Sequence, residues 1–337
     1  MAAKSRAIIR DGTASPGLVA LYLLLALVVV TLAGISFGVS ELPVVRALHL
    51  LLAPDGSPDS ALIWDVRLPR AVLALLVGAN LAVAGVLIQT LTRNSLASPQ
   101  TFGINAGASL FIVISLIALP GLSPGGTVWP AFLGAAAVGL AMWTLSVSGV
   151  MNDVKLALAG ISIQLVLSAL VQAILIANNA GQDIVYWLAG SINGAQWNKV
   201  LIILPFTLLG GGVTVVAGRH FGVLALDEAT SVSLGQNARR VGGLAAVLIV
   251  LFAGSAVAVS GPIGFIGLLV PHIVRRLVGS DQLTVIALSA ITGPLLLNAA
   301  DLAGRVAAFP AETPVGIVTA LIGAPAFLVI LLRQRVR

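Results

Sequence analysis

The sequence SGPIGFIGLLVPHIVRRLVGSD, residues 260–281, combines membrane-like hydrophobicity with features that a plain lipid-facing helix does not need. It holds two prolines, four glycines and one histidine. Each proline removes a backbone donor, and glycine lets neighbouring backbones approach closely. Inside a bilayer such interruptions persist only where protein or a water-filled path satisfies the freed backbone groups. Residues 260–281 therefore predict an irregular span inside a transport protein, with Arg275 and Arg276 at a cytoplasmic end.

The composition extends this interpretation to the whole chain. Of its 337 residues, 58% are hydrophobic and 9% are charged, and the mean hydropathy is +1.08. Soluble domains carry about 25% charged residues, so we predict one all-α polytopic membrane domain. A membrane helix needs about 20 apolar residues, which leaves room for about ten spans. The 36 glycines favour closely packed helices with small residues at their contacts.

The hydrophobic runs predict a cytoplasmic tail over residues 1–17 and ten spans within residues 18–332, the first of them not cleaved as a signal peptide. Short surface helices are expected over residues 44–52 and 186–192. With both termini inside, 13 of the 18 Lys and Arg residues are cytoplasmic, as the positive-inside rule requires. The spans cover about residues 18–38, 70–91, 101–119, 128–148, 155–177, 199–217, 241–259, 260–281, 283–303 and 315–332.

The sequence lacks the residues that several kinds of chemistry require. There is no P-loop, so the chain does not itself bind ATP in that way, and there is no dinucleotide fingerprint. The absence of cysteine excludes disulfides and thiolate metal sites. His49, His220 and His272 fall at different depths, so we predict no metal site, and His220 and His272 are read as satisfied polar groups. The +6 charge reflects the inside bias of Lys and Arg rather than nucleic-acid binding.

Charged residues deep within spans are the usual mark of ion-coupled transport. Asp301 is the main candidate here, and it stands four residues before Arg305, a spacing at which the two side chains can pair on a helix. We read them as a structural pair at a span end. The shortage of buried carboxylates disfavours an ion-coupled secondary carrier, which stays open as an alternative.

Polar segments on the two sides of the predicted membrane indicate docking surfaces. Residues 218–240 form the longest inner segment, and its partly amphipathic pattern predicts short surface helices that receive a cytoplasmic partner, against the alternative of a solvated loop. On the outer side, Arg67, Arg70 and Arg305 stand where the positive-inside rule disfavours them. As a set they could hold an acidic partner by charge-assisted bonds, although arginines at span ends often only snorkel.

The motifs of the chain, taken together, resemble the FecCD permease family, the membrane subunits of ATP-driven importers for ferric siderophores, haem and vitamin B12. The resemblance runs in order from about residue 60 to the end of the chain. YWLAGSINGAQW at residues 186–197 is similar to the ferric-enterobactin-type subunits. The other motifs are RLPR at 67–70, GANLAVAGVLIQ at 78–89, RNSLASPQTFGINAGAS at 93–109, LALAGI at 156–161, GPIGFIGLLVPHIVRRLVGSD at 261–281, ADLAGR at 300–305 and PVGIVTALIGAPAFL at 314–328.

This resemblance implies a type II ABC importer permease in a bacterial cytoplasmic membrane, carrying an iron chelate, most simply a ferric siderophore, by alternating access. Its partners would be a second permease, related or identical, two cytoplasmic ATPase subunits and an extracytoplasmic substrate-binding protein. The chain would not be an enzyme and would hold no cofactor, because ATP and magnesium would bind the ATPase subunits. A haem or vitamin B12 permease is the alternative within the class.

The resemblance also assigns expected roles to individual residues. Arg67, Arg70 and Arg305 would meet acidic residues of the substrate-binding protein. An inner gate would involve Asn94, Leu96 and Asp153, and this chain has Ser95 where the family usually has proline, which in principle loosens that loop. Docking to the ATPase is expected from Leu224, Leu226, Asp227, Glu228, Leu234 and Gly235, and a tightly packed span beside the path from Gly261, Pro262, Gly264, Gly267, Pro271 and His272.

Overall fold

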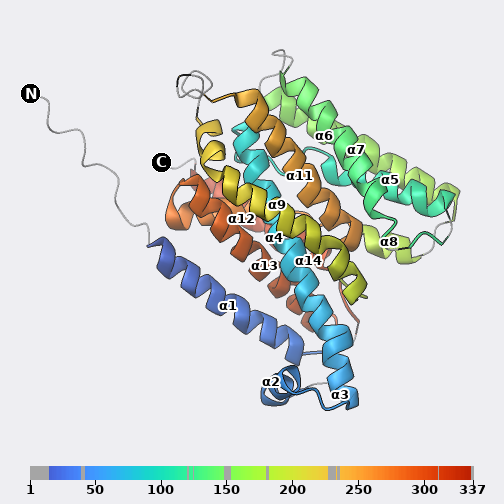
Figure 1. Ribbon diagram of the computed structural model, residues 1–337. Coiled ribbons are helices and arrows are strands. Elements are labelled where there is room, and N and C mark those ends of the chain that lie inside the picture. Colours follow the sequence, from blue (N-terminus) through green and yellow to red (C-terminus); the bar gives the residue numbers. More distant parts are fainter. Residues whose placement is uncertain are drawn as a thin grey trace, which may run out of the picture.

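The computed structural model describes residues 15–38, 42–119, 121–123, 125–147, 153–179, 182–226, 233, 236–309 and 311–334. All regular structure in these ranges is helical. Figure 1 shows the long helices running side by side between two ends of the molecule. The helices are α1 (Pro16–Ser36), α2 (Val44–Leu52), α3 (Pro58–Ala61), the π-helix η1 (Leu62–Arg67), α4 (Leu68–Thr92), α5 (Ile104–Ala118), α6 (Val128–Val147), α7 (Asp153–Ala177), α8 (Gln182–Leu188), α9 (Trp197–Leu224), α11 (Ala238–Ser260), α12 (Ile266–Val278), α13 (Gln282–Ala307) and α14 (Val315–Gln334).

The all-α membrane fold predicted from the sequence is confirmed. Seven helical segments in the described ranges are long and apolar enough to cross a membrane, and shorter apolar helical segments cover Ile104–Ala118 of α5 and Val315–Val329 of α14. Each of the ten predicted spans contains one long helix or, for residues 260–281, the 13-residue helix α12. Helix α9 continues to Leu224, beyond residue 217 where the sixth span is expected to end, because no proline interrupts it there.

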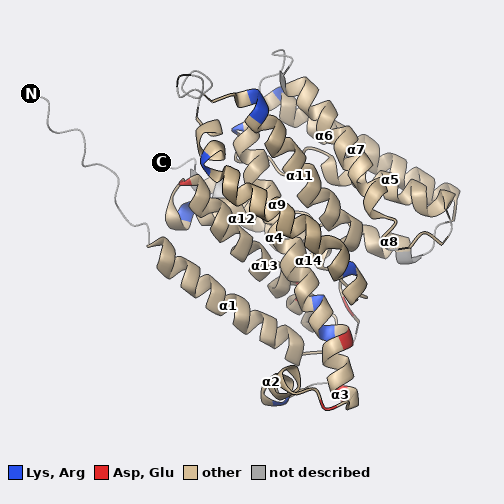
Figure 2. Cartoon of the chain, in the orientation of Figure 1, with Lys and Arg blue, Asp and Glu red and all other residues tan. Residues whose placement is uncertain are grey.

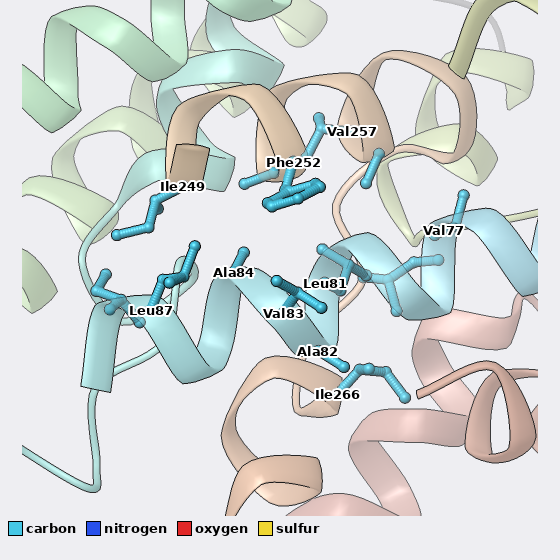
Figure 3. Close-up of a cluster of buried hydrophobic side chains, with 14 of the residues drawn as sticks. Val77, Leu81, Ala82, Val83, Ala84, Leu87, Ile249, Phe252, Val257 and Ile266 are labelled. Atoms are coloured by element: carbon cyan, nitrogen blue, oxygen red, sulfur yellow. The ribbon is translucent and has the colours of Figure 1, made fainter. Parts of the chain in front are cut away.

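Helix α4 is the centre of the bundle, because it is apolar around its whole circumference. In the continuous helix from Pro58 to Thr92, 78% of the most apolar 18-residue stretch is buried inside the protein. The corresponding share is 11% in α1 and 11% in α7. Helices α9, α11, α12 and α13 all pack against α4. Figure 3 shows Leu81, Ala84 and Leu87 of α4 facing Ile249 and Phe252 of α11. A helix that is apolar on every side belongs in a core, and the peripheral α1 and α7 are left to meet lipid or partners.

Glycines set the closest helix contacts around α4. A Cβ atom on Gly85 of α4 would lie 1.9 Å from the carbonyl oxygen of Gly267 in α12. Similarly, a Cβ atom on Gly78 would lie 2.7 Å from the backbone of Gly293 in α13. Small residues let membrane helices gain dispersion contacts that larger side chains would prevent. The prediction that the many glycines serve close packing is confirmed at these crossings.

Within residues 260–281, a short non-helical segment precedes the helix α12. Helix α11 ends at Ser260, Gly261 takes a φ of 69° and Phe265 a φ of 65°, and only then does α12 begin. Neighbouring loops bind the exposed backbone, because Ser191 donates its N–H to the Ser260 carbonyl at 2.8 Å. Helix α12 has 13 residues, fewer than the about 20 that a regular transmembrane helix needs. This agrees with the irregular span predicted from the prolines and glycines.

Candidate functional site

Charged side chains gather at the two ends of the bundle, and the middle of the ribbon in Figure 2 is largely free of them. One end carries α2 and α3, and we call it the α2–α3 end. The other carries the connection from α9 to α11, and we call it the α9–α11 end. Because an ion-coupled carrier usually places ionisable groups at mid-depth, the functional candidates in the described residues are the two ends and an uncharged groove between them.

The strongest electrostatic feature lies at the α2–α3 end, where Arg70 stands between two carboxylates. Its Nε and Nη2 atoms donate to Asp301 at 3.1 and 2.7 Å, and its Nη1 atom donates to Oε2 of Glu312 at 2.8 Å. Arg305 pairs with the other Asp301 oxygen at 3.0 Å, so the pair expected from the four-residue spacing forms. We call Arg67, Arg70, Asp301, Arg305 and Glu312 the arginine cluster.

Two members of the arginine cluster also close the end of the first helix. Nη1 of Arg67 donates to the carbonyls of Ile35 and Ser36 at 2.6 and 2.8 Å. Nη1 of Arg305 donates to the carbonyls of residues 34 and 37, both at 2.8 Å. The last carbonyls of a helix lack partners within that helix, and a cation is favourable at its negative end. A double arginine cap therefore fixes the C-terminal end of α1 to η1 and α13.

The arginine cluster is more enclosed than the sequence suggested. Arg67 is 7% exposed, and the side chains of Arg70 and Arg305 are 14% and 10% exposed. The structure brings the three predicted arginines together at one end, as their shared side required, but gives each of them internal acceptors. Sequence reasoning missed Glu312 and the α1 carbonyls as these acceptors, because both come from segments far away along the chain.

A groove of about 470 Å³ opens along α7 between the two ends. Its wall includes a stripe on α7 formed by Gln164, Ser168 and Gln172, which are spaced four residues apart and so share one helix face. Ser109 of α5 also lines it, and its buried hydroxyl has no hydrogen-bond partner. Among the residues that the structure describes, no charged side chain lines the groove. The arrangement can hydrogen-bond an oxygen-rich solute without the desolvation cost of burying a protein charge.

The predicted path-side stretch forms part of this groove. Pro262, Gly264 and Phe265 lie in its wall, and a Cβ atom on Gly264 would be 2.2 Å from Oε1 of Gln100. Gly261 instead turns the chain against the carbonyl of Trp187. The remaining predicted residues, Gly267, Pro271 and His272, are buried in α12 on the side of the bundle core. No group of metal-binding side chains occurs among the described residues.

The predicted gate loop lies directly after α4 and is held by a local hydrogen bond. The side-chain oxygen of Asn94 accepts from the backbone N–H of Leu96 at 2.9 Å, an arrangement with which asparagine commonly stabilises turns. Leu96 is exposed. Asn94 therefore orders this loop although Ser95 replaces the usual proline. Asp153 begins α7, and its side chain lies outside the described part of the chain.

Of the predicted ATPase-docking residues, the structure describes two. Leu224 is buried at the end of α9, so it contributes to the core. Leu226 follows the helix and is 43% exposed, which suits a contact residue. Nearby, Nε2 of Gln236 donates to the carbonyl of His220 at 2.8 Å and ties the two ends of the segment together. Asp227, Glu228, Leu234 and Gly235 lie outside the described residues.

Comparison with known proteins shows the family to which the chain belongs. The model of the FecCD transport family matches residues 24–333. The chain belongs to the FecCD transport family. This FecCD protein is 48% identical to the Fe(3+)-citrate import system permease protein YfmD of Bacillus subtilis, over 87% of this chain and 88% of that one. It is 36% identical to the ferric enterobactin transport system permease protein FepD of Escherichia coli, over 94% and 95%.

A solved structure agrees with the fold of this FecCD protein. It is an inward-facing conformation of a transporter assigned to the metal-chelate type of ABC transporters, and it superposes with a TM-score of 0.82 at 28% identity. The likeness covers 95% of this chain and all of that one. The chain is thus an integral membrane transport protein, and the similarity extends over the arginine cluster, the groove and both ends of the bundle.

Proposed function

We propose that this chain is the permease subunit of an ABC importer that carries a ferric chelate, such as ferric citrate or a ferric siderophore. The observation that carries the proposal is the uncharged groove along α7, with its stripe of Gln164, Ser168 and Gln172, in a chain of the FecCD family. YfmD and FepD are named for ferric citrate and ferric enterobactin, and a citrate chelate presents carboxylate and hydroxyl oxygens. Amide and hydroxyl donors on the groove wall suit such oxygens and hold them weakly enough for passage.

The groove is half of a path that a second permease completes. Only 11% of the most apolar 18-residue stretch of α7 is buried, yet this helix carries the stripe of Gln164, Ser168 and Gln172. A lipid-facing helix does not need such a stripe, because hydrocarbon offers these groups no partners. A second copy or a related subunit against α7 would enclose the groove, and we take a related partner as the first model because of the FepD-like stretch at residues 186–197.

The two ends of the bundle receive the other partners. The α2–α3 end faces outward, and its arginine cluster meets acidic groups of a substrate-binding protein. The α9–α11 end faces the cytoplasm and meets two ATPase subunits, which bind ATP and magnesium and switch the permease between two packed states. The inside bias of Lys and Arg supports this orientation. Asn94 and Leu96 contribute to an inner gate beside that end.

Two other functions remain to be distinguished by experiment. A haem or vitamin B12 permease would share the fold and the partners, and differ in cargo. An ion-coupled carrier would need ionisable groups at mid-depth, and the described lining of the groove carries none. This separates the leading proposal from a carrier on physical grounds.

Reconstitution tests the proposal directly. The chain is placed in proteoliposomes with its partner permease, the ATPase subunits and the binding protein, and uptake of radioactive iron as ferric citrate or a ferric siderophore is measured. We expect uptake that requires ATP and the binding protein. Uptake that ignores ATP but follows an imposed proton gradient would overturn the proposal, and uptake of haem or cobalamin alone would replace the cargo.

A further inference from the structure

We propose that Glu312 is an internal competitor that holds Arg70 until a carboxylate of the docking protein replaces it. The inference rests on the proposed function, because it concerns how the arginine cluster receives its partner. In the structure the Nε, Nη1 and Nη2 atoms of Arg70 each already donate to a carboxylate. A docking acid that binds the Nη1 edge of Arg70 therefore competes with Glu312.

The geometry identifies which acceptor leaves. Asp301 is bound by Nε and Nη2 of Arg70 and also by Arg305, and its side chain is 6% exposed. Glu312 makes a single contact, to Nη1 of Arg70, and its side chain is 29% exposed. Removing Asp301 would strand two buried cations, which is costly, whereas Glu312 can turn into water. The Nη1 edge of Arg70 is thus an exchangeable carboxylate site.

The charges favour an exchange over a simple addition. Three arginines and two carboxylates leave the arginine cluster with a net charge of about +1, which attracts an acidic partner from a distance. When the incoming carboxylate takes Nη1, Arg70 keeps a charge-assisted bond throughout. The exchange keeps the guanidinium paired. Because Glu312 binds the same edge of Arg70, the docking protein gains only the difference between its own binding free energy there and that of Glu312.

The displaced residue is connected to the groove. The backbone carbonyl of Glu312 accepts a hydrogen bond from Oη of Tyr186 in α8 at 2.5 Å. On the same helix Val185 and Leu188 line the groove. Tyr186 is therefore a positioning residue that joins the 308–314 segment to α8. We infer that displacement of Glu312 by the docking protein is felt at α8 through this bond.

The test uses the assembled importer in nanodiscs and its own substrate-binding protein. Glu312→Gln keeps the shape of the side chain and removes its charge, and we expect the Kd for docking to fall about tenfold, the order of one charged hydrogen bond. Asp55→Asn is the matched control, because it removes a carboxylate at the same end that pairs with Arg46 instead. The Kd of Glu312→Asp, whose side chain has a shorter reach, should lie between those of Glu312→Gln and the wild type.

A second variant tests the connection. Tyr186→Phe removes only the hydroxyl, and we expect docking within twofold of the wild type but a several-fold smaller stimulation of ATP hydrolysis by the docked protein. An unchanged or higher Kd for Glu312→Gln, or a fall matched by Asp55→Asn, would overturn the competitor role. Unchanged stimulation in Tyr186→Phe would overturn the link. Either failure with ATP-dependent uptake of ferric chelate intact leaves the proposed function standing, so the two can be told apart.

Discussion

Gly85 of α4 and Gly267 of α12 touch backbone to backbone. A Cβ atom on Gly85 would lie 1.9 Å from the Gly267 carbonyl oxygen and 2.6 Å from its Cα atom. Both partners are main chain and cannot turn aside as a flexible side chain could. The central helix and the irregular stretch over residues 261–278 are thus locked at one point, next to the wall of the groove.

Gly85→Ala should therefore destabilise the protein by about 1–3 kcal/mol, the usual range for overpacking a tight contact. Thermal unfolding in detergent measures the loss. Gly211→Ala in α9 is the control, since no atom lies within 4 Å of the added Cβ, and helix propensity alone makes it neutral or slightly stabilising. Equal stability of the two variants would show that α12 can move away from α4.

The double arginine cap predicts that Arg305 stabilises α1. Arg305→Met keeps much of the volume but leaves two carbonyls and Asp301 short of partners, and we expect a loss of about 2–4 kcal/mol. Chemical unfolding followed by tryptophan fluorescence measures it. Arg46→Met, which breaks an exposed pair with Asp55, should cost less than about 1 kcal/mol. A similar small loss for Arg305→Met would contradict the cap.

Docking is best tested at Arg70 alone. Reversing Arg67, Arg70 and Arg305 together to Glu would also remove the cap of α1, so lost docking could mean lost structure. Arg70→Gln leaves Asp301 paired with Arg305, and we expect docking of the binding protein to weaken more than about tenfold, as for loss of a charged hydrogen bond. Surface plasmon resonance at physiological salt measures the Kd, and an unchanged value would remove Arg70 from the docking surface.

The stripe on α7 predicts selective loss of transport. Ser168→Ala and Gln172→Leu remove hydrogen-bonding groups from the groove wall, and we expect ferric chelate uptake to fall about tenfold for the glutamine, on the scale of one or two hydrogen bonds. ATP hydrolysis without substrate should stay near the wild-type rate. Ser162→Ala is the matched control, because its hydroxyl bonds the carbonyl of Leu158 outside the groove. Equal uptake by all three variants would place the path elsewhere.

Coupling to the ATPase is tested at Leu226. The sequence offered both Leu224 and Leu226, but Leu224 is buried and a charge there would unfold the end of α9. Leu226→Glu should reduce co-purification of the ATPase subunits and lower transport several-fold without loss of thermal stability. Leu48→Glu, an exposed leucine on α2 at the opposite end, controls for the added charge. A fully active Leu226→Glu complex would point to another docking loop.

The fold was predictable because membrane hydrophobicity and the positive-inside rule act on local stretches of sequence. The irregular structure of residues 260–281 was predictable from the prolines and glycines within them. The site was only partly predictable. Arg67, Arg70 and Arg305 stood out by sign and position, but their acceptors on α1 and at Glu312 depend on tertiary contacts. The groove on α7 has a sequence signal in the four-residue spacing of Gln164, Ser168 and Gln172, but uncharged residues at this spacing are also common on helices without a groove.

The cap of α1 has a consequence for the way the chain is made. The carbonyls at its C-terminal end are bound by Arg67 and by Arg305, which lies 271 residues after Gly34. Synthesis delivers α1 first and α13 almost last, so for most of translation Arg67 alone can hold this end of α1. Until then the carbonyls of residues 34 and 37 lack the partner that Arg305 provides in the finished fold, and a buried carbonyl without a partner is costly. The last helices to be made therefore complete the first, and a chain cut before residue 305 should leave α1 with half of its cap and more accessible to quality-control proteases.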